Sequence, residues 1–200
     1  MKRVVAQSNA FSYRTDGPEI VDESAPLDTE AGGAWGEIAG AAAALEEAVL
    51  GGSGFDGVVL RYGALYGPGS AYAPDGAYGE LIMKRRLPIV GGGAGRQAFV
   101  HLEDAVSATV MALDRGEGVY NVADDDSARA REWIPGLAEA LGAKKPFSVP
   151  AWLGRMAAGP AVVRLMTDQR GASNAKIRDE LGWRPKYEDW RAGFPTLTAG

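Results

Sequence analysis

Short apolar segments alternate with helical patterns along the 200-residue chain, and this alternation limits its fold more than any other feature. Buried strands are predicted at 3–8, 55–62 and 119–122, where β-branched and other apolar residues run together. Helices are predicted between them at 34–50 and 105–113, where apolar and small residues recur at helical spacing. Strands and helices in this order are typical of a parallel sheet. We therefore predict the α/β class, with a partial parallel sheet and a small C-terminal α+β lobe.

Turn residues and local periodicity predict the remaining elements. They are helices at 77–87 and 132–141, an edge strand at 87–90, a short strand at 97–102, and a helix from Ser173 or Asn174 to Leu181. A polar loop is predicted at 13–33. Asp104 is expected to cap the helix at 105–113, and Gly51 is expected to end the helix at 34–50 in a left-handed conformation.

Composition excludes several classes of protein. The formal charge is −5, which argues against a nucleic-acid or anionic-membrane partner. The chain has no cysteine and one histidine, so disulfides, thiolate metal sites and histidine-ligated metal clusters are excluded. It has no apolar run of about 20 residues and no pattern of a secretory signal. We expect a soluble cytoplasmic protein whose partner is a small molecule.

The position of the first strand is unusual for a parallel sheet. The strand at 3–8 has almost nothing before it, so it is expected to lie at an exposed sheet edge. Only three buried strands are predicted, and the sheet is therefore expected to be incomplete. The exposed edge is expected to stay unpaired or to support self-association.

Five segments, in this order, resemble the extended short-chain dehydrogenase/reductases of the NAD-dependent epimerase/dehydratase group. They lie at 4–8, 60–69, 99–105, 119–122 and 181–185. The first is similar to the strand that ends at that family's catalytic serine or threonine. The others are similar to its "LR…YGPG", "FVHVDDVA", "YNV" and "LGWxP" segments.

The resemblance implies a domain organisation and a cofactor. Residues 1–70 correspond to the second part of a Rossmann-like nucleotide-binding domain, and 71–200 mostly to the substrate-binding lobe, with a strand at 119–123 returning to the main sheet. The family's glycine-rich pyrophosphate turn does not precede Arg3, so the chain is expected to begin midway through that domain. NAD or NADP is the implied cofactor, with weak or absent binding by this chain. The glycine run at 91–95 is interpreted as a flexible loop, with phosphate binding as the alternative.

One departure from the family concerns its proton relay. Family members carry Tyr-x-x-x-Lys on the helix after the serine strand, where the lysine and the bound cofactor lower the tyrosine pKa. Here Trp35 stands in the tyrosine position and Ala39 in the lysine position. An indole N–H donates a hydrogen bond but is neither an acid nor a base near neutral pH. The usual proton relay is therefore not encoded at its usual place.

The candidate catalytic residues follow from the resemblance. Ser8 ends the first strand, where the family's hydroxyl binds the substrate oxygen, and it is also a candidate cofactor contact. Tyr62 and Gly63 follow the second strand, near the family's nicotinamide site, and Tyr66 lies in the next loop. Tyr62 and Tyr66 are candidate substitute acids. The alternatives are that Ser8 satisfies a turn and that both tyrosines are packing aromatics.

Candidate substrate-binding residues lie further along the chain. Arg96 resembles the arginine that holds a diphosphate in sugar-nucleotide epimerases, displaced by one residue; a solvated loop arginine is the alternative. Trp152, with Leu165 and other apolar residues, is interpreted as pocket lining or as core. Arg170 and Asn174 are expected to face the same pocket.

Two further features are interpreted as structural. His101 precedes a predicted helix and is expected to be hydrogen-bonded rather than catalytic. The acidic run at 124–126 is interpreted as a solvated turn, and no metal site is predicted.

Two functions follow. The first is an NAD(P)-dependent oxidoreductase or epimerase/dehydratase-like protein that acts on a small carbonyl, hydroxyl or sugar-like substrate, with impaired cofactor binding in this chain. The alternative is a non-catalytic ligand-binding or regulatory module on the same fold, which the replacement of the proton relay favours.

Overall fold

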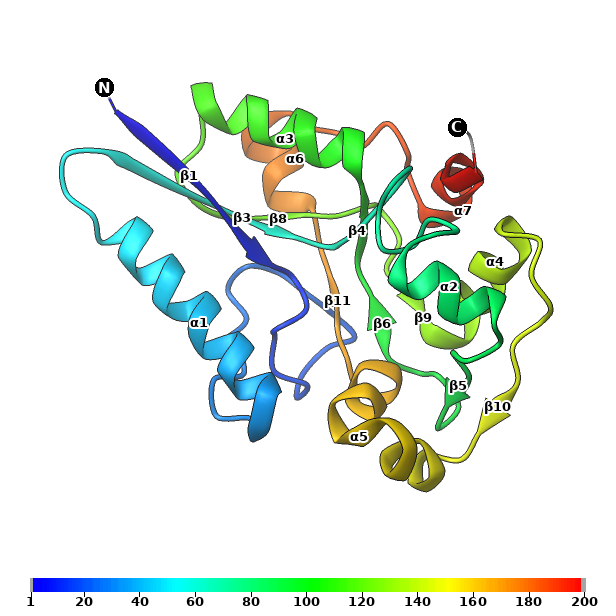
Figure 1. The fold of residues 1–200 in the computed structure, drawn as a ribbon. Coiled ribbons are helices and arrows are strands. Elements are labelled where there is room, and N and C mark those ends of the chain that lie inside the picture. Colours follow the sequence, from blue (N-terminus) through cyan, green and yellow to red (C-terminus); the bar gives the residue numbers. More distant parts are fainter. Residues whose placement is uncertain (1, 199–200) are drawn as a thin grey trace.

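A three-stranded parallel sheet forms the centre of the computed structural model, which describes residues 2–198 (Figure 1). Its strands are β1 (Arg3–Asn9), β3 (Asp56–Tyr62) and β8 (Gly118–Val122), in the order β1-β3-β8. In this register Ser8 lies beside Arg61. The predicted α/β class and the three predicted buried strands are confirmed.

Helices cover both faces of this sheet (Figure 1). Helix α1 (Gly33–Leu50) packs against β1 and β3, while α3 (Leu102–Asp114) and α6 (Ala175–Leu181) pack on the other side. Side chains alternate along a strand. Leu60 therefore packs in one core with residues of α3 and α6, whereas its neighbour Arg61 contacts α1.

The rest of the chain forms a lobe of short strand pairs and helices. Its strand pairs are β2 (Ile20–Val21) with β11 (Gly171–Ala172), β4 (Ala64–Tyr66) with β7 (Phe99–His101), β5 (Ile89–Val90) with β10 (Ser148–Val149), and β6 (Arg96–Gln97) with β9 (Ala128–Arg129). Its helices are α2 (Ala77–Met83), α4 (Ala130–Ala140), α5 (Ala151–Thr167) and α7 (Trp190–Gly193), followed by the 3₁₀ turn Phe194–Thr198. Edge-to-face aromatic contacts among Phe99, Trp133 and Phe194 lie in the core of this lobe.

Several sequence predictions were wrong in detail. The segment at 13–33 is not only loop, because it contains β2 and a bridge between Tyr13 and Leu27. Helix α5 was not predicted, since Gly159 interrupts it with a φ of 84° and Pro160 follows. Helix α1 ends at Gly51 with a φ of −85°, which is right-handed rather than left-handed.

The cap of α3 also differs from the prediction. His101, and not Asp104, is the N-cap residue, and its Nδ1 accepts a hydrogen bond from the Glu103 amide. The carboxylate of Asp104 instead accepts hydrogen bonds from the backbone amides of Lys186 and Tyr187. Asp104 therefore connects α3 to the C-terminal segment.

Strand β1 is an edge of the sheet within residues 2–198, because its only partner there is β3. The Arg3 guanidinium donates hydrogen bonds to the carbonyls of Ala112 and Gly116, which fastens the start of the strand to the end of α3. Self-association through this edge stays a prediction. Across residues 2–198, none of the helices has the length and apolar character that crossing a bilayer requires.

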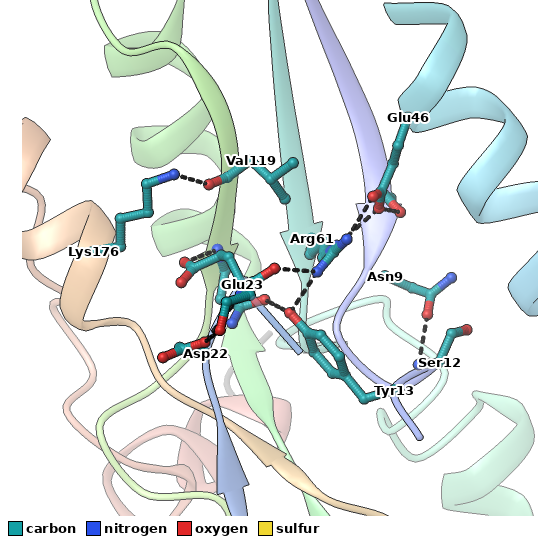
Figure 2. Close-up of polar contacts among 12 residues, drawn as sticks. Asn9, Ser12, Tyr13, Asp22, Glu23, Glu46, Arg61, Val119 and Lys176 are labelled. Carbon is teal, nitrogen blue, oxygen red and sulfur yellow. Dashed lines mark hydrogen bonds and ion pairs between the residues drawn. The ribbon is translucent and has the colours of Figure 1, made fainter. Parts of the chain in front are cut away.

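A buried ion pair joins the sheet to α1 (Figure 2). The Arg61 guanidinium donates to both carboxylate oxygens of Glu46, at 2.8 and 2.6 Å, and both side chains are buried. Arg61 also donates to the Tyr13 hydroxyl at 2.9 Å, and the Ser8 hydroxyl donates to Glu46 at 2.7 Å. Burial opposes the charged form of Arg61, but the hydrogen bonds to Glu46 leave its pKa raised. The Arg61 side chain on β3 is thus bonded directly to Glu46 of α1 and to Tyr13 in the segment after β1. Glu46 in turn connects this pair to Ser8 of β1.

Replacement of Glu46 by glutamine is expected to lower the free energy of unfolding by about 3 kcal/mol, since it leaves a buried guanidinium without its counter-charge. Urea denaturation at pH 7 measures this change. Glu47→Gln, at the next and exposed position of α1, is the matched control. Equal stability of the two variants would contradict this account of the ion pair.

Candidate active site

A cavity of about 640 Å³ lies at the carboxyl ends of the central strands, and we refer to it as the inner cavity. Phe11 reaches it from the segment after β1, and Ala64 and Leu65 reach it from β4, directly after β3. Trp35 and Ile38 line it from the first turns of α1. Parallel α/β sheets bind ligands at this edge.

The lining of the inner cavity is apolar and uncharged. Among the described residues that line it there is no aspartate, glutamate, histidine, lysine or arginine; its polar members are Ser70, Tyr72, Tyr78 and Gln97. Trp35 is buried, its indole N–H has no hydrogen-bond partner among residues 2–198, and the Arg164 guanidinium lies 5.1 Å from its ring centre. The inner cavity therefore offers a ligand apolar contact and a few neutral polar groups.

A second cavity of about 690 Å³ lies between α2, α4 and α5, and we refer to it as the outer cavity. The two cavities share Tyr72, Tyr78, Gln97 and Leu165, so they adjoin. The rings of Tyr72 and Tyr78 stack at 4.9 Å. The helices and the β5–β10 pair around the outer cavity lie together in the second lobe (Figure 1).

The predicted catalytic residues do not line either cavity. Ser8 is buried and its hydroxyl is bonded to Glu46. The Tyr62 hydroxyl is bonded to Thr109 on α3, and burial raises its pKa. Tyr66 is fully buried among aromatic rings, and burial raises its pKa strongly. Catalytic roles for these three residues stay predictions, and each would require its hydroxyl to change partners or become accessible.

Gly63, a predicted cofactor contact, lies between β3 and β4. A methyl group at this position would lie 2.8 Å from the carbonyl oxygen of Ala98, so the close approach of the two chain segments requires glycine. Its amide donates to the Val122 carbonyl. A cofactor contact by Gly63 stays a prediction.

Of the predicted substrate-binding residues, Arg96 and Asn174 line one small cavity of about 210 Å³, whereas Trp152 and Arg170 do not line it. Arg96 forms an ion pair with Glu19 at 2.8 Å and donates to the Ser127 carbonyl. Arg170 donates to the carbonyl of Thr15. These contacts hold loops together, away from the inner and outer cavities.

Asn174 and Trp152 also lie outside the two cavities. Asn174 donates to the carbonyl of Ala123 at 2.8 Å and to Asp125 at 2.7 Å. Trp152 is 63% exposed. Of the apolar residues that were expected with Trp152 to line a pocket, Leu165 lines both cavities and Met166 lines the outer cavity. The substrate roles of Arg96, Trp152, Arg170 and Asn174 stay predictions.

Three polar residues that line the cavities, Tyr72, Tyr78 and Gln97, were not predicted as site residues from the sequence. Gln97 follows Arg96, and neighbouring strand residues point to opposite sides, so Gln97 faces the cavities when Arg96 faces Glu19. The sequence indicated this only through Arg96, which is displaced by one residue from the position of the family's diphosphate-binding arginine. Tyr72 and Tyr78 carried no signal beyond their aromatic character.

His101 is hydrogen-bonded, as predicted, and it is also buried. Its Nδ1 accepts from the Glu103 amide, its Nε2 lies 3.1 Å from the Thr196 hydroxyl, and burial lowers its pKa. Both ring nitrogens are therefore occupied by structural contacts. Among residues 2–198, no three acidic, histidine or cysteine side chains come together as a metal site.

The acidic run at 124–126 is not simply a solvated turn. Asp124 is 2% exposed, and neither of its carboxylate oxygens has a hydrogen-bond partner within 3.5 Å among the described residues. Burial, together with the nearby carboxyls of Asp104 and Asp189, raises the pKa of Asp124 to about 9. Burial thus favours the neutral, protonated form of the Asp124 carboxyl group in the folded protein.

Asp124 is expected to make stability fall as pH rises. Its folded pKa lies above its unfolded value of about 4, so the folded state binds the extra proton and loses stability between about pH 4 and pH 9. Asp124→Asn should therefore raise the free energy of unfolding at pH 8 by at least about 1 kcal/mol and leave it nearly unchanged at pH 4. Urea denaturation at the two pH values measures this, with the exposed Asp114→Asn as control. A variant that is less stable than the wild type at pH 8 would refute the prediction.

Solved structures with a similar fold include an epimerase in complex with NAD and a protein of unknown function. The chain superposes with a TM-score of 0.72 on the UDP-glucose 4-epimerase of Thermus thermophilus in complex with NAD, at 26% identity over 98% of this chain and 62% of the epimerase. It superposes with a TM-score of 0.75 on a functionally unknown conserved protein from Silicibacter pomeroyi, at 25% identity over 98% of this chain and 65% of that protein. The architecture is that of the extended short-chain dehydrogenase/reductases.

Sequence comparison agrees with the fold. Residues 36–123 match the NAD dependent epimerase/dehydratase family. It is 42% identical over 195 residues to a 3-diazoavenalumate denitrifying reductase from a Streptomyces species. The match covers 96% of this chain and 64% of that reductase, so the chain spans less than two thirds of its relative.

Proposed function

We propose that this chain supplies the hydride-acceptor site of an NAD(P)-dependent reductase. The reductase relative at 42% identity and the epimerase structure that contains NAD support this class. When bound, NAD(P)H supplies a hydride. The chain's own contribution is the inner cavity, which holds the acceptor at the carboxyl ends of β1 and β3.

The inner cavity fits the nicotinamide end of the cofactor but not its phosphates. Phe11, Ala64 and Leu65 give the flat ring apolar walls at the strand ends, and about 640 Å³ has room for a ring and a small acceptor. The described lining has no charged side chain for a pyrophosphate. We therefore propose that residues 2–198 alone bind NAD(P) weakly.

The character of the inner cavity restricts the reaction. Reduction of a carbonyl requires a proton at the oxygen as well as a hydride at the carbon. Trp35 and Ala39 stand where the family places its proton relay, and the described lining has no lysine or other charged side chain beside its two phenols, Tyr72 and Tyr78. This absence of a tyrosine–lysine relay or of a charged acid or base is the observation that carries the proposal.

Reductive removal of a diazo group suits such a site. As the new carbon–hydrogen bond forms from the hydride pair, the carbon–nitrogen bond breaks and its pair leaves with N₂. The positive charge of an aryl diazonium ion and the negative charge of the hydride cancel, so no proton is transferred. The name of the Streptomyces relative states the loss of nitrogen from a diazo compound, and we propose the same reaction class here, in preference to small carbonyl, hydroxyl or sugar-like substrates.

A non-catalytic ligand-binding module is the second candidate. The replacement of the proton relay by Trp35 and Ala39 supports this candidate as well as it supports the reductase. The relay would be absent both from a protein that has lost its catalytic activity and from an enzyme that catalyses a different reaction. Turnover separates the two candidates.

The activity test joins this chain to the part of the Streptomyces reductase that lies outside the match, and we refer to the product as the complemented enzyme. With NAD(P)H it is expected to convert 4-carboxybenzenediazonium to benzoate and N₂, at a rate that changes little between pH 6 and pH 8, because no charged side chain lines the inner cavity. The matched aldehyde, 4-formylbenzoate, should be reduced at least about a hundredfold more slowly, as general acid catalysis contributes about that much. Gas analysis and cofactor absorbance follow the two reactions, with an enzyme-free control.

Equal reduction of the aldehyde would contradict the proton-free reaction, and binding without turnover would favour the module. Ile38→Trp provides a second check, since it fills the inner cavity from an exposed position of α1. It should lower kcat/KM at least about tenfold, which corresponds to about 1.4 kcal/mol. Leu45→Trp, at an exposed position of α1 that does not line the inner cavity, is the control.

Residues 1–200 by themselves are expected to show no measurable NAD or NADP binding in isothermal titration at submillimolar cofactor. The reason is the uncharged lining of the inner cavity, which cannot compensate the pyrophosphate charge. The complemented enzyme is the positive control. A micromolar dissociation constant for the chain alone would overturn this prediction.

A further inference from the structure

We infer that the outer cavity binds the carboxylate end of an elongated aromatic acid, with Arg86 as its anion partner. This inference rests on the proposed function, because it places the reacting end of the same acceptor in the adjoining inner cavity. It adds the chemical class of the acceptor and a residue that selects it.

The charge of the outer cavity is the first observation. Its described lining contains two arginines, Arg85 and Arg86, and no aspartate or glutamate, in a chain whose formal charge is −5. The other lining residues are almost entirely apolar or aromatic. An apolar chamber with a purely cationic rim favours a ligand that has an apolar body and an anionic end.

The two arginines differ in how they are held. Arg86 forms no ion pair or side-chain hydrogen bond with residues 2–198, so its guanidinium is available to a ligand. Arg85 makes a long 3.5 Å contact to the Lys145 carbonyl, and its backbone has a φ of 53°. Arg85 is the only residue other than glycine with a positive φ among residues 2–198. Glycine would adopt this conformation without strain, and such strain is concentrated at functional sites.

Aromatic side chains indicate the nature of the ligand body. The stacked rings of Tyr72 and Tyr78 lie where the two cavities meet, and Trp133 and Phe147 line the outer cavity. A planar unsaturated ligand contacts such rings well, through offset or edge-to-face packing. It would extend from the inner cavity past the tyrosine pair toward the arginines.

A nucleotide sugar fits these cavities poorly. Arg96, the arginine expected to hold a diphosphate, is paired with Glu19, and Gln97 faces the cavities in its place. Ala64 offers a methyl group at the strand end. Neither cavity therefore presents a built diphosphate site, whereas a single carboxylate requires only one guanidinium.

Binding of 4-hydroxycinnamate to the chain tests this inference without any turnover. Its neutral amide, 4-hydroxycinnamamide, is the matched ligand that lacks the charge. Isothermal titration at low ionic strength should show the acid binding about tenfold more tightly than the amide, because a charge-assisted hydrogen bond is lost with the amide. Arg86→Gln should remove this preference by weakening the acid about tenfold and leaving the amide within about twofold. Arg131→Gln, an exposed arginine on α4 outside the lining, should leave both affinities unchanged.

Arg85→Gly gives a second, independent readout. It is expected to weaken binding of the acid while it preserves or raises the midpoint of urea unfolding, since it relieves the positive φ. If Arg85 served only the fold, its replacement would not weaken acid binding while it preserved or raised the stability. Loss of stability together with unchanged acid binding would oppose a ligand role for Arg85.

The outcomes separate this inference from the proposed function. Acid binding that depends on Arg86, without turnover in the complemented enzyme, would keep the inference and reject the reductase. Turnover of benzenediazonium, which lacks the carboxylate, at the same rate as 4-carboxybenzenediazonium would keep the reductase and reject the inference. Equal affinity for acid and amide, or tighter binding of octanoate than of 4-hydroxycinnamate, would also reject it.

Discussion

The ion pair between Arg61 and Glu46 is the interaction on which the arrangement of the site depends. It connects the centre of the sheet to α1, and α1 carries Trp35 and Ile38 into the inner cavity. A buried ion pair of this kind requires well-matched geometry and further hydrogen bonds to compensate the desolvation of both charges, and Tyr13 and Ser8 provide such bonds. Ser8 belongs to the same hydrogen-bond network, because its hydroxyl donates to Glu46, and this explains why a hydroxyl at the family's catalytic strand has a structural partner here.

In the lobe of short strand pairs and helices, ion pairs and hydrogen bonds also determine which charged groups remain at the cavities. Most arginines near the cavities are paired with acids or carbonyls, as Arg96 is with Glu19 and Arg164 with Asp28. Among the described residues, the inner cavity therefore has no charged lining residue, and the outer cavity is lined by two arginines. The inner cavity suits a hydride acceptor that needs no proton, and the outer cavity suits a ligand with one negatively charged end.

The sequence allowed the three central strands and α1 to be predicted, because continuous β-branched or alanine-rich segments leave few alternatives. The sequence did not reveal α5, since Gly159 and Pro160 interrupt its helical pattern. It also did not reveal which way the Arg96 side chain points, because that depends on the strand register of β6. The replacement of the proton relay was visible at once in Trp35 and Ala39. The uncharged lining of the inner cavity was not, because it combines residues from 11 to 165 that only the fold brings together.

Transfer of isotope from the cofactor to the product tests the central claim most directly. The complemented enzyme would react 4-carboxybenzenediazonium in ordinary water with a nicotinamide cofactor deuterated at the transferred position. The account predicts one deuterium on the ring carbon that bore nitrogen, and one N₂ for each cofactor oxidised. Hydrogen from water at that carbon, or cofactor oxidation without N₂, would contradict it.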